Sequence, residues 1–147
     1  MKKISIVLIM IMLSMFIVVS LSACSNSNSV LEDTKWFLTS YETQNKLEGL
    51  IEDTQITATF NSTESEVTGS AGCNTYWAIY EVKGSELSIS EMSWTEMGCI
   101  SPEGVMEQEQ AFLSLLAKAQ TFEANDTTLT IFCSGGQQLY FTTDIIQ

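Results

Sequence analysis

The stretch that most constrains the fold runs from Val67 to Tyr80 and reads Val-Thr-Gly-Ser-Ala-Gly-Cys-Asn-Thr-Tyr-Trp-Ala-Ile-Tyr. Both of its ends are rich in the β-branched and aromatic residues that favour strands. The glycines between them are typical of a tight turn, and no lysine follows them as it would in a phosphate-binding loop. The stretch therefore predicts two strands joined by a turn that carries Cys73 and Asn74.

The N-terminus has the layout of an export signal. Two lysines precede an apolar run from Ile4 to Val19, and small residues follow it. The run is short for a membrane span, and no stop-transfer charge comes after it. Leu21-Ser-Ala-Cys24 resembles a lipobox, which predicts removal of residues 1–23 and lipidation of Cys24. An ordinary cleaved signal with an unmodified Cys24 is the alternative.

The residues after the signal predict how the domain is held and where it resides. Residues 24–32 are expected to be the lipidated cysteine and a flexible tether, because Ser25-Asn-Ser-Asn-Ser29 is polar and of low complexity. Two or more acyl chains on one residue anchor a protein stably. We therefore expect an exported protein, lipid-anchored on the extracytoplasmic side of the cell membrane or outer membrane, with one monomeric domain over residues 33–143.

The charge of the expected mature chain argues against a nucleic-acid partner. Without residues 1–23, four lysines remain against eighteen carboxylates, and there is no arginine or histidine, so the net charge is −14. Such a surface repels phosphate backbones and anionic lipid. Solubility is the simplest reason for the excess of acid.

Alternating apolar residues predict a mostly β (α+β) fold, an antiparallel half-barrel sheet packed against one amphipathic helix. A polar connection is expected over residues 42–53, and Lys83-Gly-Ser85 is expected to be a hairpin turn. Besides the strands that flank the central turn, strands or extended segments are expected at Thr34–Ser40, Gln55–Phe60, Glu86–Ser90, Met92–Met97, Thr121–Ala124, Thr128–Cys133 and Gln138–Thr142.

The helix is expected from Pro102 to about Ala119, with Ser101 as its N-cap. Its apolar residues gather on one side at 100° per residue, and Glu109 falls among them. A carboxylate buried there needs hydrogen-bond partners or a raised pKa. Two interpretations stand: a proton-transfer acid, or, as we favour, a structural hook that accepts hydrogen bonds from a strand end or a turn near Asn74.

The cysteines are interpreted first as disulfide partners, because an exported protein resides in an oxidising compartment. Cys133 lies on an inward strand face and is expected to be a buried thiol. There is no Cys-x-x-Cys motif and no histidine, so we expect no metal site and no cofactor. A catalytic thiol would need a neighbouring histidine or cation, and a Gly-x-Ser-x-Gly motif is absent. We therefore expect no enzymatic activity.

Trp77, Ile79 and Trp94 are candidates for an exposed apolar face that binds a protein or lipid partner. The alternative is that the helix or another strand covers them. A groove between helix and sheet that carries a lipid or small apolar ligand is a second functional hypothesis. Exposure of Trp77 favours the first hypothesis, and a connected apolar cavity favours the second.

The chain resembles the META domain, also called the HslJ-like domain, of envelope lipoproteins. The resemblance covers nearly all of residues 33–142 and is carried by motifs in the expected order. These are the early Trp36 strand, Gln55-Ile-Thr-Ala-Thr-Phe60, Gly69-Ser-Ala-Gly72-Cys-Asn74-Thr-Tyr76 with Tyr80, Gly84 before Leu87-Ser-Ile89, Thr95-x-Met97-x-Cys99, Met106-Glu-Gln-Glu109, and the final Leu129-Thr-Ile131 and Leu139-x-Phe141 pair.

The resemblance implies a half-barrel sheet against one helix, a Cys73–Cys99 disulfide, and structural roles for Gly69, Gly72, Asn74, Tyr76, Thr95 and Glu109. It also implies an envelope role linked to stress or drug tolerance, without an agreed catalytic site. The chain departs from the pattern where Ala78 replaces a usual glycine and where Trp77 is bulkier. The resulting expectation is a non-enzymatic envelope protein that acts as a binding or stress-related interaction module, with the apolar-ligand carrier as its alternative.

Overall fold

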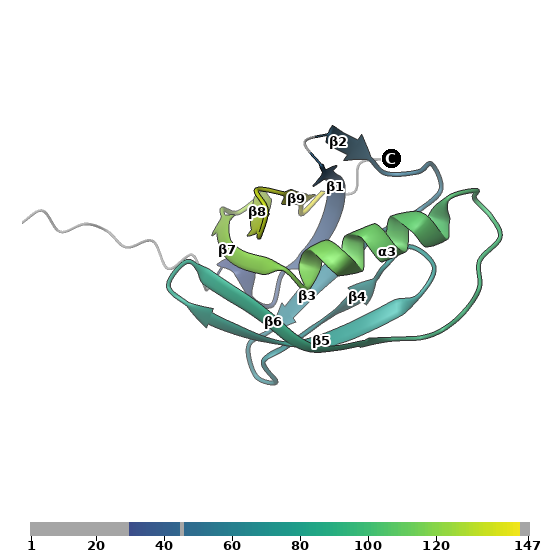
Figure 1. Cartoon of the computed structure of the whole chain (residues 1–147). Helices are drawn as coiled ribbons and strands as arrows, with labels where there is room; N and C mark the ends of the chain where they lie inside the picture. Colours follow the sequence, from purple (N-terminus) through teal and green to yellow (C-terminus); the bar gives the residue numbers. More distant parts are fainter. Residues whose placement is uncertain (1–29, 45, 145–147) are drawn as a thin grey trace, which may run out of the picture.

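The computed structural model describes residues 30–44 and 46–144 (Figure 1). The predicted signal peptide, the lipidation site Cys24 and the tether Ser25–Ser29 lie outside the described residues. Within the described part, no helix combines the length and the apolar character that crossing a membrane requires.

Short strands and one longer helix make up the described residues, which agrees with the predicted mostly β class. Their order is β1 (Lys35–Thr43), β2 (Lys46–Gly49), β3 (Thr57–Asn61), β4 (Glu66–Ser70), β5 (Thr75–Lys83), β6 (Glu86–Trp94), α3 (Val105–Leu116), β7 (Ala119–Ala124), β8 (Thr128–Cys133) and β9 (Gln138–Thr142).

The sheet closes on itself, so the predicted open half-barrel is wrong. β1 pairs with β3 along one edge and with β9 along the other, and β3 to β9 pair in sequence order. The result is a closed antiparallel barrel of eight strands, with β2 added beside the second half of β1. Closure depends on the length of β1, whose residues Lys35–Phe37 meet β3 while Phe37–Tyr41 meet β9. Alternation within each strand does not reveal such a contact between chain ends.

Three local differences from the predicted elements have identifiable causes. β2 forms inside the expected polar connection as a hairpin partner of β1. The segments expected on either side of Glu91 are one strand, β6, with an irregularity where Glu91 adopts a φ of 50°. The helix begins at Val105 instead of Pro102, because Gly104, with a φ of 84°, takes the N-cap position predicted for Ser101.

The barrel interior is filled by large side chains from the strands and from α3. Trp36, Phe60, Tyr76, Phe112 and Phe122 are among the largest fully buried residues. Figure 1 shows α3 lying between the β3–β5 side of the barrel and strands β8 and β9. The ring of Phe112 on α3 meets the ring of Tyr76 on β5 edge to face, at 5.5 Å between centroids. Aromatic packing therefore joins the helix to the sheet.

Gly69 lies in β4 opposite Tyr76 rather than in the turn expected for it. A Cβ atom at this position would collide with the backbone carbonyl of Thr57. That carbonyl also accepts a hydrogen bond from the buried Tyr76 hydroxyl at 3.0 Å, so it is held in place. Glycine is therefore required for the close approach of β3 and β4.

We expect Gly69→Ala to lower the free energy of unfolding by about 1–3 kcal/mol, because the methyl group overpacks a fixed backbone. Urea denaturation of the full chain measures the change. Gly49→Ala is the matched control, since a Cβ there meets nothing within 4 Å. Equal stability of the two variants would show that β3 and β4 can separate without cost.

Candidate functional site

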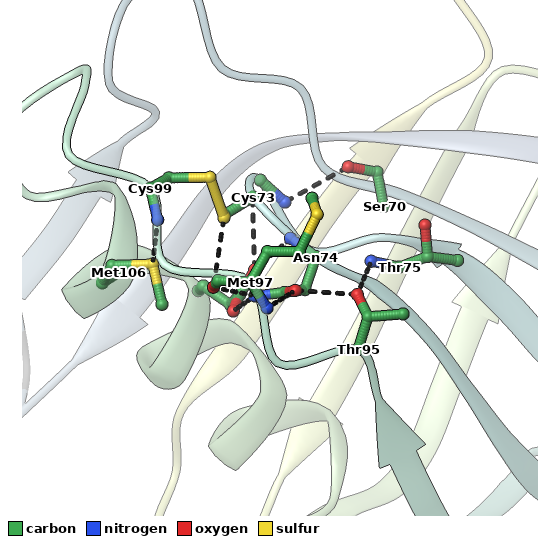
Figure 2. Close-up of a disulfide and its surroundings, with 10 residues drawn as sticks. Ser70, Cys73, Asn74, Thr75, Thr95, Met97, Cys99 and Met106 are labelled. Atoms are coloured by element: carbon green, nitrogen blue, oxygen red, sulfur yellow. Dashed lines mark hydrogen bonds between the residues drawn. A yellow bond between two sulfur atoms is a disulfide. The ribbon is translucent and has the colours of Figure 1, made fainter.

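One polar cluster joins the β4–β5 turn, the segment after β6 and helix α3 (Figure 2). Its centre is Asn74, which is only 2% exposed. The Asn74 Oδ1 atom accepts hydrogen bonds from Thr95 Oγ1 at 2.7 Å and from the Met97 amide at 2.8 Å. The Asn74 Nδ2 atom donates to the Met97 carbonyl at 3.1 Å and to Glu109 Oε1 at 2.7 Å. One side chain thus connects three segments that are distant in sequence.

Glu109 has the contacts expected of the structural hook. Its carboxylate is 3% exposed, and its Oε2 atom accepts hydrogen bonds from the amides of Cys73 at 3.1 Å and Asn74 at 2.6 Å. Together with Asn74 Nδ2, all the described donors to Glu109 are amides, and they engage both carboxylate oxygens. The clamp, as we call Asn74, Thr95, Met97 and Glu109, is therefore a device that fixes the turn and the segment after β6 to α3.

The disulfide predicted from the family resemblance is present beside the clamp. Cys73 and Cys99 are bonded with their Cα atoms 6.0 Å apart, and they close a loop with a sequence separation of 26. Figure 2 shows Met106 on α3 below this bond, where its sulfur accepts a hydrogen bond from the Cys99 amide at 3.4 Å. The bond therefore ties the segment after β6 to the β4–β5 turn at a second point.

Cys133 is a free and buried thiol, as predicted. Burial raises its pKa to about 11, although Lys118 lowers it slightly. The thiol is therefore protonated at neutral pH, the form that is a poor nucleophile.

Gln108 is a buried hook that sequence reasoning missed. Its Oε1 atom accepts a hydrogen bond from the Ile51 amide at 2.8 Å, and its Nε2 atom donates to Thr54 Oγ1 at 2.9 Å. Adjacent residues Gln108 and Glu109 thus attach two different loops to α3. The available signal was a second polar residue beside Glu109 at the edge of the apolar stripe.

The three residues predicted to form one apolar face do not share a face. Trp77, Ile79 and Trp94 are 41%, 39% and 40% exposed, so none is fully covered. Trp77 and Ile79 lie on the outer face of β5, whereas Trp94 pairs with the inward-facing Tyr76. The irregularity at Glu91 inserts a residue into β6 and moves Trp94 to the opposite face, as bulges do.

A surface hollow of about 760 Å³ lies between β1 and the loop of residues 50–55. Its lining includes Phe37, Leu50 and Thr142, and it contains no residue of α3. The hollow is therefore separate from the helix–sheet interface in which a ligand groove was expected. Within residues 30–44 and 46–144, no group of His, Cys, Asp or Glu side chains is placed to hold a metal ion.

The fold and the clamp define a small closed barrel with one helix attached by a buried carboxylate and one disulfide. Residues 29–144 match the family model described as META domain, and the chain belongs to this family. A comparison with curated proteins found no match.

Solved structures with a similar fold include an NMR structure of a protein from Burkholderia xenovorans, at 25% identity and a TM-score of 0.66, covering 79% of this chain and 85% of that one. Another NMR structure is 18% identical with a TM-score of 0.59, covering 78% of this chain and 92% of the other. A crystal structure of a DUF4847 family protein from Bacteroides vulgatus is 13% identical with a TM-score of 0.58, covering 82% and 99%. The last two show the fold alone.

We expect Glu109→Gln to lower the free energy of unfolding by about 1–3 kcal/mol. The new side-chain NH₂ group would face amide donors in a buried site, where neither donor would have an acceptor. Urea denaturation measures this change. Glu107→Gln, on the exposed face of the same helix, is the control and should change stability by less than about 0.5 kcal/mol. If the two substitutions changed the free energy of unfolding equally, the clamp would not be a source of stability.

Reduction of the Cys73–Cys99 bond should lower the free energy of unfolding by about 3 kcal/mol, the entropy expected for a loop of this length. Urea denaturation with and without a reductant tests this, and mass spectrometry of unreduced peptides checks the pairing. The buried Cys133 serves as an internal control, since it should stay unpaired. A peptide that joins Cys73 to Cys133 would contradict the structure.

Proposed function

We propose that this META-domain protein is a non-enzymatic, lipid-anchored envelope protein that binds a partner protein through the outer face of β5. The observation that carries the proposal is the exposure of Trp77 and Ile79, at 41% and 39%, on adjacent outward positions of one strand. Tryptophan is the residue most enriched among those that dominate the energy of protein interfaces.

The neighbours of these residues resemble the rim of an interface. Trp77 lies between Thr68 of β4 and Ser93 of β6, and Ile79 lies between Glu66 and Ser90. Polar residues around an apolar centre match the usual arrangement of protein interfaces. We name Trp77 and Ile79 the β5 face.

The lipid anchor in the proposal limits how far the β5 face can stand from a membrane. Leu31 is fully buried, and its carbonyl accepts a hydrogen bond from the Trp36 indole at 3.0 Å, so the domain is attached to its N-terminal segment there. Six residues lie between Cys24 and Leu31, and the seven steps along the chain reach at most about 25 Å when extended. The proposed partner is therefore a protein close to the membrane surface or embedded in it.

The non-enzymatic part of the proposal is supported by the state of the reactive groups. Glu109 is engaged by amide donors, and Cys73 and Cys99 are bonded to each other. Cys133 is buried and protonated at neutral pH. Glu109 and the disulfide thus serve the structure, and the Cys133 thiol is in its poorly nucleophilic form.

The alternative, a carrier of an apolar ligand, requires room between helix and sheet. Phe112 and Leu116 of α3 are fully buried, and Phe112 packs on Tyr76. This packing favours the protein partner, and ligand binding becomes an outcome of the test.

A photoreactive phenylalanine analogue in place of Trp77, introduced into the full chain in its own cells, should crosslink to a protein. The same analogue in place of Leu47, which is 60% exposed on β2, is the control for any exposed apolar site. Ile79→Lys should reduce the Trp77 adduct by about tenfold, because a charge in the apolar centre of an interface is costly.

Three results would contradict the proposed partner. Equal amounts of adduct at Trp77 and Leu47 would show that the contact is non-specific. An adduct at Trp77 that Ile79→Lys does not reduce would show that the β5 face is not the binding site. A lipid adduct at Trp77 would favour a membrane-contact role instead.

A further inference from the structure

The barrel is incompletely joined between β6 and β7. β6 has nine residues and pairs with β5 from Glu86 to Trp94, but it pairs with β7 only where Glu86 meets Thr121. Because the pairing is antiparallel, β7 begins at Ala119 beside Ser88, shortly after the end of α3 at Leu116, and the rest of β7 pairs with β8. Residues Ser88–Trp94 therefore form a strand edge that has no described partner strand on the β7 side.

The register shows which backbone groups point out of this edge. The two-residue turn between Lys83 and Glu86 makes that pair hydrogen-bonded, so alternation directs the N–H of Ile89 away from β5. At the other end, the Thr95 amide donates to the Thr75 carbonyl at 3.0 Å, so the N–H of Trp94 points away as well. Such groups are a template for an added strand.

A hollow of about 520 Å³ lies at the end of β6 that pairs with β7, and Glu81 and Lys83 of β5 also line it. Leu87 and Ser88 of β6 form one side, and Ala119, Gln120 and Thr121 of β7 form the other. The hollow gives an incoming chain space beside the start of the free edge.

The charge of the edge favours a basic partner over a second copy of this chain. Glu86 and Glu91 are exposed on β6, and Glu81 on the neighbouring strand is offset by an ion pair with Lys83 at 2.9 Å. The described residues carry a net charge of −14. Two copies of the edge would repel each other, whereas lysine or arginine side chains would be attracted.

We propose that the free edge of β6, Ser88–Trp94, is a second binding site that accepts an extended, basic segment of a partner protein as an added antiparallel strand. Main-chain hydrogen bonds to β6 supply affinity, and the glutamates select for positive charge, as in other cases of strand addition. The site is distinct from the β5 face, because it uses the edge of the sheet instead of its outer surface.

The probe is a capped octapeptide of alternating lysine and valine, added to the full mature lipoprotein in a non-ionic detergent. Amide hydrogen exchange measured by NMR should slow by about tenfold or more at Ile89 and Trp94 when the peptide binds. A peptide of the same sequence in which every residue is N-methylated should lose this protection, because it keeps its charge but has no backbone N–H donor on the residues of either edge.

Charge dependence is tested on both partners. An octapeptide of alternating glutamate and valine should not bind. Glu91→Asn, which tolerates the positive φ at this position, should weaken binding of the lysine peptide about threefold or more. Glu64→Gln, in the β3–β4 turn, is the matched control and should leave binding unchanged.

Equal affinity for the N-methylated peptide would overturn the proposal, since attraction would then be purely electrostatic. Protection at residues outside β6, or an absence of binding at about 1 mM peptide, would overturn it as well. None of these results bears on crosslinking at Trp77, so the two proposals fail or stand separately.

Discussion

The structure depends on one buried carboxylate, that of Glu109, which holds the β4–β5 turn against α3. Two turn amides and the side chain of Asn74 donate to it at 2.6–3.1 Å. Taking a carboxylate out of water is costly, and three amide donors offset this cost only if the turn keeps one geometry. The carboxylate therefore specifies the conformation of the turn, and through Asn74 it also specifies the path of Thr95 and Met97.

Barrel closure places a second constraint on the same helix. The barrel interior is lined by Trp36, Phe60 and Phe122, so α3 does not lie across an open inner sheet face. α3 instead contributes Phe112 to the interior, while its buried polar pair, Gln108 and Glu109, attaches loops at its N-terminal half. Apolar packing and polar attachment thus act on successive turns of one helix, which explains why Glu109 interrupts the apolar stripe.

Sequence reasoning recovered the features that depend on local pattern. Alternation of apolar residues located most strands, and the apolar stripe located the helix. The position of Glu109 within that stripe predicted that it accepts hydrogen bonds from a turn near Asn74. Long-range pairing was not recoverable, because closure requires β1 to meet both β3 and β9. The face of Trp94 was also missed, since one inserted residue at Glu91 reverses the alternation of side chains without a glycine to mark it.

The family motifs and the proposed binding surfaces use different residues. Gly69, Asn74, Tyr76, Thr95, Cys99 and Glu109 are all occupied by close backbone approach, the clamp or the disulfide. Asn74, Tyr76 and Glu109 are buried, so they cannot also meet a partner without opening the fold. The two proposed binding surfaces, the β5 face and the edge of β6, lie at positions that this framework leaves free. A change at Trp77 or Glu91 removes no hydrogen bond of the clamp, so the proposed surfaces can vary in sequence while the framework is kept.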